Sequence, residues 1–516
     1  MTNQHAGLGQ VLAEQRIAER REQAAQARPA GAGRPPSVAA GPWLVAAGAP
    51  ARHRHRSEPH HREGVVRSMT RLLLVTSMVA ALSASAVGPA SARPATGTAV
   101  TAWNAVAGRA ARDACLAPTN NPLHESRLYA AMHVAVHDAL NAIDRRARPY
   151  AFRAEPMPAA APEAAVAAAA RGVLVPLLQQ LPAPFSDCVA ANAAVAPVEA
   201  AYTAALAAIP DGRAKRQGVG LGQAAAAAIL ARRATDGSGT PLFDTAYPQG
   251  TRPGEWRFTP GFDFALAPGW AEVTPFVLRD SAQFRPGPPY AVTGSRYATD
   301  LAEVKRLGGD GTTTPSARTA EQTEVALFWV ESSPLQWNRI ARTVAAARGL
   351  DLWQSARLFG LLNMALADGY IASFDTKYHG YNYWRPVTAI RTADTDGNPD
   401  TSADPTWTPL VPTPPIPDYD SAHAVEGGAA AQVLRRFFGT DHLGFTTCSL
   451  TLPAGSTCDD LAPVLRSYTS FSQARDENGR SRILVGFHFR KAVQEGIDHG
   501  RQIGNRAVER TLQPVG

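Results

Sequence analysis

Cysteine is scarce in this chain, and the few that occur are not arranged as zinc ligands. Only four are found among 516 residues, and none lies at metal-ligand spacing from a second cysteine and a histidine. An even number is typical of disulfides in an exported protein. Cys448 and Cys458 enclose a segment rich in Thr, Ser, Gly and Pro, which predicts a stapled surface loop and leaves Cys115 to pair with Cys188.

The chain also lacks several short motifs of well-known enzyme chemistries. After residue 92 it contains no G-x-G-x-x-G, P-loop, H-E-x-x-H or G-x-S-x-G pattern. Strand-like alternation is rare, and no short repeat is visible. No apolar run after residue 92 reaches the roughly eighteen residues that span a bilayer. We therefore expect the mature protein to be soluble and to have no membrane span.

The first 92 residues are not expected to belong to the folded protein. Residues 1–68 mix Ala, Gly, Pro and Arg with a His/Arg run and show no hydrophobic period. That run is compatible with a nucleic-acid-binding tail, but disorder or a translated leader upstream of the true start is the simpler explanation. Basic residues then flank Met69, and an apolar run extends from Leu72 to Val87. Residues 69–92 therefore predict a signal peptide cut after Ala92, and a secreted protein.

The leader also accounts for the basic composition. The whole chain has 51 Lys and Arg against 44 Asp and Glu, a net charge of +7. Residues 1–68 contain ten Arg and five Glu, and the predicted signal peptide adds one Arg. The remainder therefore has 40 basic and 39 acidic side chains, a net charge near +1. A chain so close to neutrality is not expected to be a general nucleic-acid binder.

Apolar residues recur at three- and four-residue steps through most of the remaining chain. This period predicts helices over residues 126–143, 162–181, 193–209, 213–234, 319–330, 337–348, 351–374, 421–438 and 479–512. Residues 235–315 are instead rich in Gly, Pro and aromatics and predict a long irregular connection. We therefore expect an all-α protein with two helical bundles, one over 93–310 including the connection and one over 311–516.

Three segments of the second bundle collect side chains that suit a phosphate-like oxyanion. They are Lys377–Pro386, Pro417–His423 and Ser481–His488. Guanidinium groups match the oxygens of an oxyanion bidentately, and a lysine adds a point charge. A serine at a helix start offers its hydroxyl beside free backbone N–H groups. One histidine can then bond to the central atom while another moves protons.

Taken one at a time, these residues have plainer explanations. Lys377 and Arg385 are then solvated charges, and Ser421 is an N-cap. His488 lies in an apolar stretch and would be a hydrogen-bonded core histidine. Only the three segments together, in this order, predict a site.

In this order the segments resemble the signature of the superfamily of type-2 phosphatidic acid phosphatases and vanadium-dependent haloperoxidases. The likeness is strongest over about residues 365–505, including the flanking stretches WRPVTAIR and SRILVGFHFRKAVQEG. It implies the two helical bundles of that superfamily, with vanadate, or phosphate as a competing occupant, bound in the second.

The resemblance also implies a role for each matching residue. His488 corresponds to the histidine that binds vanadium in the peroxidases and attacks phosphorus in the phosphatases. His423 corresponds to the acid–base histidine on the opposite side. The oxygens of the oxyanion would be held by the remaining matches, which are Lys377, Arg385, Ser421, Arg482 and the backbone N–H of Ala422, where the family usually has Gly.

Three positions depart from the family pattern. Seven residues rather than six separate Lys377 from Arg385. On a regular helix the extra residue moves the lysine from about 20° to about 80° off the face of the arginine. A bulge at Gly380 would absorb the extra residue. Asp420 replaces the usual Pro and is expected to raise the pKa of His423. Ala492 stands where the phosphatases have an Asp that orients the nucleophile, which favours the peroxidases.

The favoured interpretation is a haloperoxidase that uses hydrogen peroxide to oxidise a halide at a vanadate bound to His488. An acid phosphatase acting on a phosphate ester through a phosphohistidine is the alternative, and a secreted protein that binds phosphate or vanadate without turnover is a third. Chloride oxidation is not expected, because Ile416 stands where chloride-oxidising relatives have an aromatic residue. As halogenating relatives often assemble, the 235–315 connection could mediate a homo-oligomer.

The first bundle resembles the superfamily more loosely, through His133, His137, Asp138 and Asn141 on one predicted helix. The two histidines lie four residues apart, a spacing compatible with a shared metal. Structural packing is the favoured explanation.

Overall fold

The computed structural model describes residues 98–182 and 193–515. The predicted leader, signal peptide and cleavage site lie outside these residues, as does Cys188 with its predicted bond to Cys115. Helices supply most of the regular structure in the described part, which confirms the predicted all-α class. They are α2 (Ala99–Asp113), α3 (Pro122–Asn141), α4 (Pro162–Gln179), α6 (Val195–Ala207), α7 (Arg213–Arg232), α8 (Ser295–Gly308), α9 (Ala320–Phe328), α10 (Ser333–Ala347), α11 (Leu352–Asp375), α12 (Pro386–Arg391), α13 (Ala422–Phe438), α14 (Phe471–Leu484) and α15 (Arg490–Arg510).

Short strands and single turns complete the described structure. Strand β1 (Phe243–Asp244) pairs antiparallel with β2 (Ala265–Leu266), and β3 (Phe445–Thr447) pairs antiparallel with β4 (Arg466–Tyr468). Helical turns add η2 (Pro268–Glu272), η3 (Thr376–Tyr381) and η4 (Ala393–Thr395). The predicted Cys448–Cys458 disulfide is confirmed, and it closes a loop between β3 and β4.

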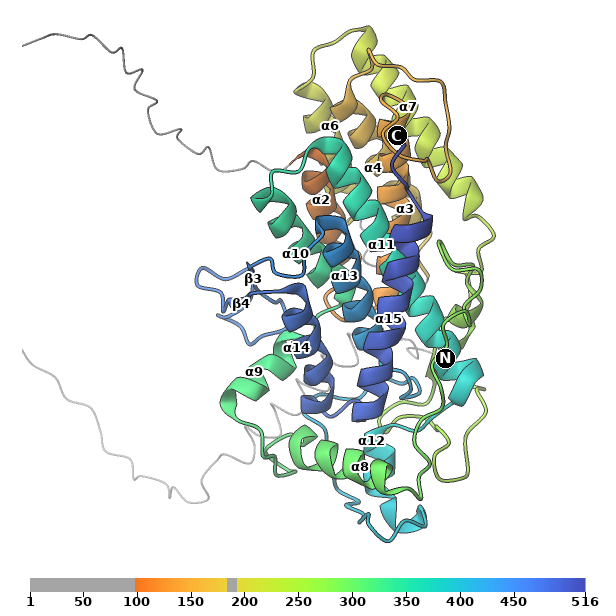
Figure 1. The fold of residues 1–516 in the computed structure, drawn as a ribbon, viewed down its shortest axis with the longest axis vertical. Coiled ribbons are helices and arrows are strands. Elements are labelled where there is room, and N and C mark those ends of the chain that lie inside the picture. Colours follow the sequence, from red (N-terminus) through yellow and green to blue (C-terminus); the bar gives the residue numbers. More distant parts are fainter. Residues whose placement is uncertain (1–97, 183–192, 516) are drawn as a thin grey trace, which may run out of the picture. The chain divides into compact units, whose positions relative to one another are not determined.

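Helix α11 is the shared centre of the two bundles. It packs against α3 of the first bundle and against α13 of the second (Figure 1). Every side chain from Leu358 to Asp375 is buried, so this helix is enclosed on all its faces. Since the Lys377 segment directly follows α11, this enclosed helix leads into the first predicted motif.

Helices α13 and α15 approach each other closely because of a row of glycines on α15. A Cβ at Gly496 would lie 2.8 Å from the carbonyl oxygen of Ser421, and one at Gly504 would lie 2.7 Å from that of Ala429. At Gly500 a Cβ would overlap the carbonyl oxygen of Val425. Only glycine permits this backbone contact, which brings the start of α13 next to the start of α15.

Two predicted boundaries were wrong. The connection 235–315 contains α8, whose apolar residues Tyr297, Leu301 and Val304 are buried at helical spacing. The sequence pattern missed α8 because its one row of apolar residues is short and lies within Gly- and Pro-rich sequence. The last predicted helix is in fact two, α14 and α15, which are separated at Gly486 with φ 87°. A Cβ there would lie 2.7 Å from the carbonyl oxygen of Gly308. The break therefore needs glycine both for its positive φ and for this close backbone contact.

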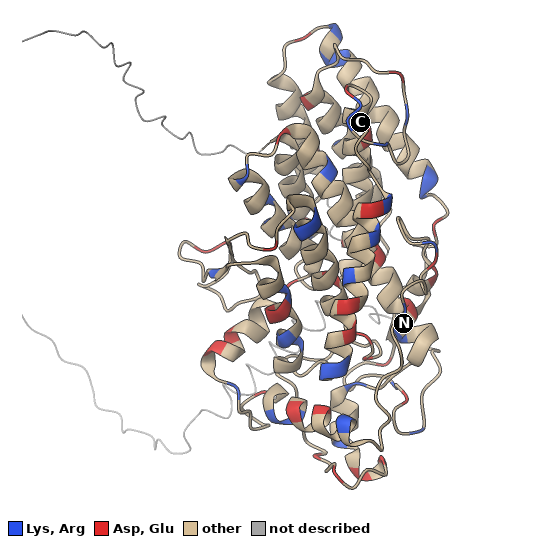
Figure 2. Cartoon of the chain, viewed as in Figure 1, with Lys and Arg blue, Asp and Glu red and all other residues tan. Residues whose placement is uncertain are grey.

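No helix within residues 98–182 and 193–515 is both long and apolar enough to cross a bilayer. Acidic and basic residues alternate along several helices, for example along α8, α14 and α15 (Figure 2). This mixed surface matches the near-neutral charge calculated for the chain after residue 92.

The glycine row predicts the effect of one added methyl group. Gly500→Ala should destabilise the protein by about 1–3 kcal/mol, because the methyl forces α15 away from α13. Gly220→Ala is the matched control: Gly220 lies exposed in α7 with open space around it, and the change should stabilise by about 0.5–1 kcal/mol. Urea unfolding measures both changes, and equal stability of Gly500→Ala and the wild type would contradict the close contact.

Candidate functional site

The extra residue of the first motif is absorbed by a change of helix type. Residues Thr376–Tyr381 form the π-helical turn η3 at the end of α11. A π turn contains one residue more than an α turn, so the chain has the bulge that the spacing required. Gly380 lies inside this turn, where a Cβ would press on the Arg285 side chain at 3.2 Å.

Lys377 consequently reaches the second motif. Its fully buried ammonium group donates hydrogen bonds to the carbonyl oxygens of Pro417, at 2.8 Å, and Asp418, at 2.9 Å, and to that of Asp420. Burial, reinforced by the nearby charge of Arg385, lowers the pKa of Lys377 to about 7. The lysine therefore fixes the loop that precedes Ser421. It also places a positive charge close to that of Arg385.

Arg385 connects all three segments. Its Nε donates to the carbonyl oxygen of Ile416 at 2.6 Å, just before the second motif. Its Nη1 donates to the carbonyl oxygen of Phe487 and to Nε2 of His488, both at 3.0 Å, in the third motif. Burial lowers the pKa of Arg385 to about 10, against the opposing effect of Asp418.

The break between α14 and α15 places Arg482 and His488 together. The carbonyl oxygen of Arg482 accepts hydrogen bonds from the backbone N–H groups of Phe487, at 3.0 Å, and His488, at 3.2 Å. The Arg482 guanidinium donates through Nη1 to the carbonyl oxygen of Trp329 at 2.6 Å. Its Nε is buried and has no partner in the described part of the chain.

Asp418 orients His488, a role that the sequence prediction missed. The Nδ1 of His488 donates to Oδ1 of Asp418 at 2.8 Å, and both side chains are buried. Ala492, where the phosphatases have an Asp that orients the nucleophile, weighed against phosphatase chemistry. A carboxylate from the second motif contacts the imidazole in its place, so this argument loses its force. Two acids flanking Tyr419 inside a predicted site were the available signal.

The second motif presents Ser421 at the start of α13. Ser421 is the N-cap, but its hydroxyl makes no capping bond and has no partner within the described residues. Ala422 follows as the first helical residue, where the N–H groups of a helix point outward without intrahelical acceptors. Hydroxyl and backbone donors are thus free to bind an anion.

His423 is held by a backbone carbonyl rather than by a carboxylate. Its Nε2 donates to the carbonyl oxygen of Glu331 at 3.3 Å. Burial, followed by the charge of Arg482, lowers the pKa of His423 well below its usual range. The expectation that Asp420 raises this pKa was wrong, because its carboxylate accepts instead from Ser373 and His499, both at 2.7 Å.

The three buried cations form a cluster that an oxyanion would suit. We call Lys377, Arg385 and Arg482 the cationic cluster; burial is the main cause that lowers the pKa of each, and Arg385 lowers the other two. A bound anion would offset both the dehydration and the repulsion. The unpartnered Ser421 hydroxyl and Arg482 Nε add hydrogen-bond donors. The residues present therefore fit a vanadate or phosphate group.

The histidine pair of the first bundle does not converge on one point. Nε2 of His133 contacts Asn104 at 2.8 Å, whereas His137 contacts Asp138 at 3.0 Å and Asn141 at 3.1 Å. No group of three or more His, Cys, Asp or Glu that could hold a metal ion occurs within residues 98–182 and 193–515. These contacts support the packing interpretation.

The fold and these contacts define a helical-bundle protein with a buried cationic cluster beside two histidines. Residues 357–516 match the family model of the VCPO second helical-bundle domain. The vanadium chloroperoxidase of Curvularia inaequalis is 26% identical over 281 residues, 43% of this chain and 45% of that protein. The match thus spans less than half the length of this relative.

Solved structures share the fold over most of the chain. A bacterial vanadium-dependent iodoperoxidase superposes with a TM-score of 0.65 at 24% identity, covering 81% of this chain and 97% of the other. The holo form of a bacterial vanadium-dependent chloroperoxidase gives 0.58 at 21% identity, covering 74% and 90%. With the domain match, these likenesses fit the chain to the superfamily of vanadium-dependent haloperoxidases and type-2 phosphatidic acid phosphatases.

The Asp418–His488 contact predicts different effects on two similar anions. Asp418→Asn keeps the shape of the side chain but removes the carboxylate that accepts from Nδ1 and makes His488 a stronger ligand. Vanadate, which would bond to Nε2, should bind on the order of 10- to 100-fold more weakly. Phosphate, held by the cationic cluster without that bond, should bind as tightly as before or more tightly.

Isothermal titration of both anions measures this difference, with exposed Asp394→Asn as the matched control. Equal weakening of vanadate and phosphate would mean general damage to the site, and no weakening of vanadate would remove the role of Asp418.

Proposed function

We propose that this protein is a haloperoxidase that uses hydrogen peroxide to oxidise a halide with the help of a bound vanadate. The observation behind the proposal is the state of His488. Its Nδ1 is occupied by Asp418, which leaves the lone pair of Nε2 facing Arg385 of the cationic cluster. A neutral imidazole held in this way is a metal ligand or a nucleophile.

The chain has several groups that could hold such an anion. Nε2 of His488 would bind vanadium, and the cationic cluster, the Ser421 hydroxyl and the N–H of Ala422 would hold the oxygens. Bound vanadate supplies a Lewis acid that activates hydrogen peroxide without changing its own oxidation state. Arg385, which donates to Nε2 of His488, would turn its Nη1 toward an oxygen.

His423 is suited to move a proton at this site. Because its Nε2–H is committed to the carbonyl oxygen of Glu331, the lone pair of Nδ1 remains as the acceptor. Burial lowers its pKa well below the usual range, so the ring is neutral near pH 7 and can take a proton from hydrogen peroxide. The positive charge of Arg482 lowers the same pKa, so the protonated ring would readily release the proton again.

The relatives support a peroxidase over a phosphatase. The site residues of this chain support that choice less than the sequence analysis suggested. The Curvularia relative and the superposed structures are named as chloroperoxidases or an iodoperoxidase. Ala492, in contrast, no longer argues for either chemistry, because Asp418 takes the place of the missing acid at His488.

A phosphatase is the second candidate, because the Asp418–His488 contact would equally orient His488 as a nucleophile. His488 would attack the phosphorus of a phosphate ester, and His423 would protonate the leaving oxygen. A binder without turnover is less well supported, because it would need neither the oriented nucleophile nor the second histidine. We propose that the protein acts outside the cell, in agreement with its Cys448–Cys458 disulfide.

Two assays on the purified protein distinguish these functions. With vanadate and hydrogen peroxide, it should brominate a phenolic dye, and it should hydrolyse an aryl phosphate far more slowly. Rapid hydrolysis with no bromination at saturating vanadate would replace the proposal by the phosphatase. Anion binding without either reaction would leave a protein that binds phosphate or vanadate without turnover as the remaining candidate.

Replacement of His488 tests the assignment of the site for any of these chemistries. His488→Ala should reduce turnover to the background rate, because it removes the only side chain proposed to bond to the central atom. His442→Ala, at an exposed histidine outside the site, should keep the wild-type rate. Full activity in His488→Ala would remove the assignment.

A further inference from the structure

The end of α9 and the residues that follow it touch two residues of the site through their backbone. The carbonyl oxygen of Trp329 accepts from Nη1 of Arg482 at 2.6 Å, and the carbonyl oxygen of Glu331 accepts from Nε2 of His423 at 3.3 Å. We call residues 327–331 the anchor segment. Its position therefore sets where one cation of the cationic cluster and the acid–base histidine point.

The disulfide-closed loop 448–458 holds the anchor segment from its other side. Ser449 Oγ donates to the carbonyl oxygen of Phe328 at 2.8 Å, and Thr451 Oγ1 donates to that of Leu327 at 2.7 Å. The backbone N–H of Leu450 donates to the Glu331 carboxylate at 3.3 Å. Three consecutive residues of a stapled loop thus bind a five-residue segment.

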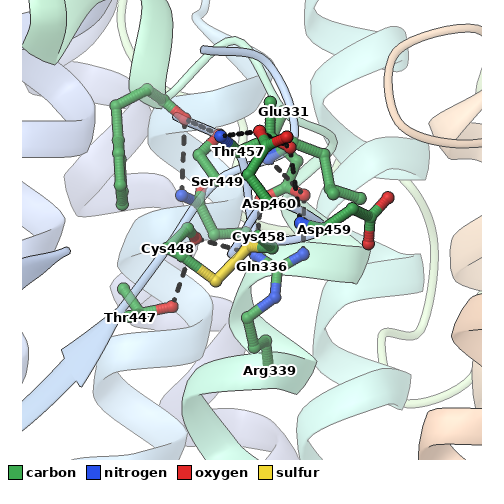
Figure 3. The surroundings of a disulfide bond; sticks show 12 residues. Glu331, Gln336, Arg339, Thr447, Cys448, Ser449, Thr457, Cys458, Asp459 and Asp460 are labelled. Atoms are coloured by element: carbon green, nitrogen blue, oxygen red, sulfur yellow. Dashed lines mark hydrogen bonds and ion pairs between the residues drawn. A yellow bond between two sulfur atoms is a disulfide. The ribbon is translucent and has the colours of Figure 1, made fainter. Parts of the chain in front are cut away.

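A buried ion pair joins the loop, the anchor segment and α10. The Arg339 guanidinium pairs bidentately with the Glu331 carboxylate, with both N–O distances 2.7 Å. It also donates to the carbonyl oxygen of Cys448 at 3.0 Å. Figure 3 shows Arg339 and Glu331 near the Cys448–Cys458 disulfide. Burial alone would lower the pKa of Arg339, but the Glu331 carboxylate raises it above its usual value.

Glu331 therefore faces two ways. Its carboxylate is bound by Arg339 and the stapled loop, while its backbone carbonyl holds His423. We infer that Glu331 is a positioning residue for His423 and Arg482, and that the 448–458 staple fixes it. This inference rests on the oxyanion site of the proposed function and applies equally to its peroxidase and phosphatase forms.

The length of the His423 contact makes the site sensitive to this segment. At 3.3 Å the bond to Glu331 is near the long end of N–H···O hydrogen bonds, so a small outward shift of the carbonyl would break it. A misplacement of about 1 Å at a distance from the chemistry can cost roughly 100-fold in rate. A loosened anchor segment would also withdraw the acceptor that aims Arg482.

The first test replaces the charge of Glu331. Glu331→Gln keeps the backbone carbonyl and the side-chain length but removes the ion pair, and Glu331→Asp keeps the charge. Glu331→Gln should weaken phosphate binding on the order of 10-fold or more, measured by isothermal titration well below its melting temperature. Glu331→Asp should recover part of that loss. A role in stability alone would lower the melting temperature of Glu331→Gln and leave the affinity of the folded protein unchanged.

The second test opens the staple without touching a buried charge. A reductant would act on other cysteines too, so the paired change Cys448→Ser with Cys458→Ser is used. It should weaken phosphate binding and reduce kcat in the assay that the wild type supports, because the loop then holds Glu331 less firmly. Thr446→Ala is the control: Thr446 is exposed on β3 of the same hairpin and bonds to Ser467 rather than to the anchor segment.

Phosphate affinity equal to that of the wild type in folded Glu331→Gln and in the paired cysteine variant would overturn the inference. If Glu331→Gln fails to fold, the cysteine variant decides alone. A wild-type protein that binds neither phosphate nor vanadate would contradict the proposed oxyanion site itself, which is a different outcome from selective loss in the variants.

Discussion

The buried guanidinium of Arg385 joins three segments that are far apart in the sequence. Removed from water, its N–H groups need acceptors within the protein. They find them in Ile416 on one side and in Phe487 and His488 on the other. The same dehydration applies to Lys377, which binds the carbonyl groups between these two points. The result is a cluster of buried cations, and an anion with several oxygens would offset their repulsion.

The fold and the site were predictable where local pattern decides. Helical period identified the long helices, and residue type with spacing identified the cations and histidines of the site. It failed where packing decides, because the break at Gly486 depends on the nearby Gly308 backbone. The extra residue of the first motif did indicate a bulge at Gly380, which the structure contains as a π turn. Asp418 was visible in the motif, but only the folded chain brings it to His488, and no side-chain pattern indicates that the Glu331 carbonyl holds His423.

The choice of chemistry is separate from the presence of the site. Vanadate and phosphate have similar charge and shape, so a cluster of guanidinium, ammonium and hydroxyl groups accepts both. With Asp418 on Nδ1, His488 is equally prepared to bind a metal and to attack phosphorus. The groups around His423, which include the backbone carbonyl of Glu331, would likewise serve either chemistry.

The central claim is that His488 and the cationic cluster surround one oxyanion position. A crystal structure of the protein soaked in orthovanadate tests this most directly. We expect a vanadate bonded to Nε2 of His488, with its oxygens contacting Arg482, Lys377 and the hydroxyl of Ser421, and with the Asp418–His488 hydrogen bond retained. Vanadate bound elsewhere, or an empty site in which Arg385 still donates to Nε2 of His488 at saturating vanadate, would contradict the account.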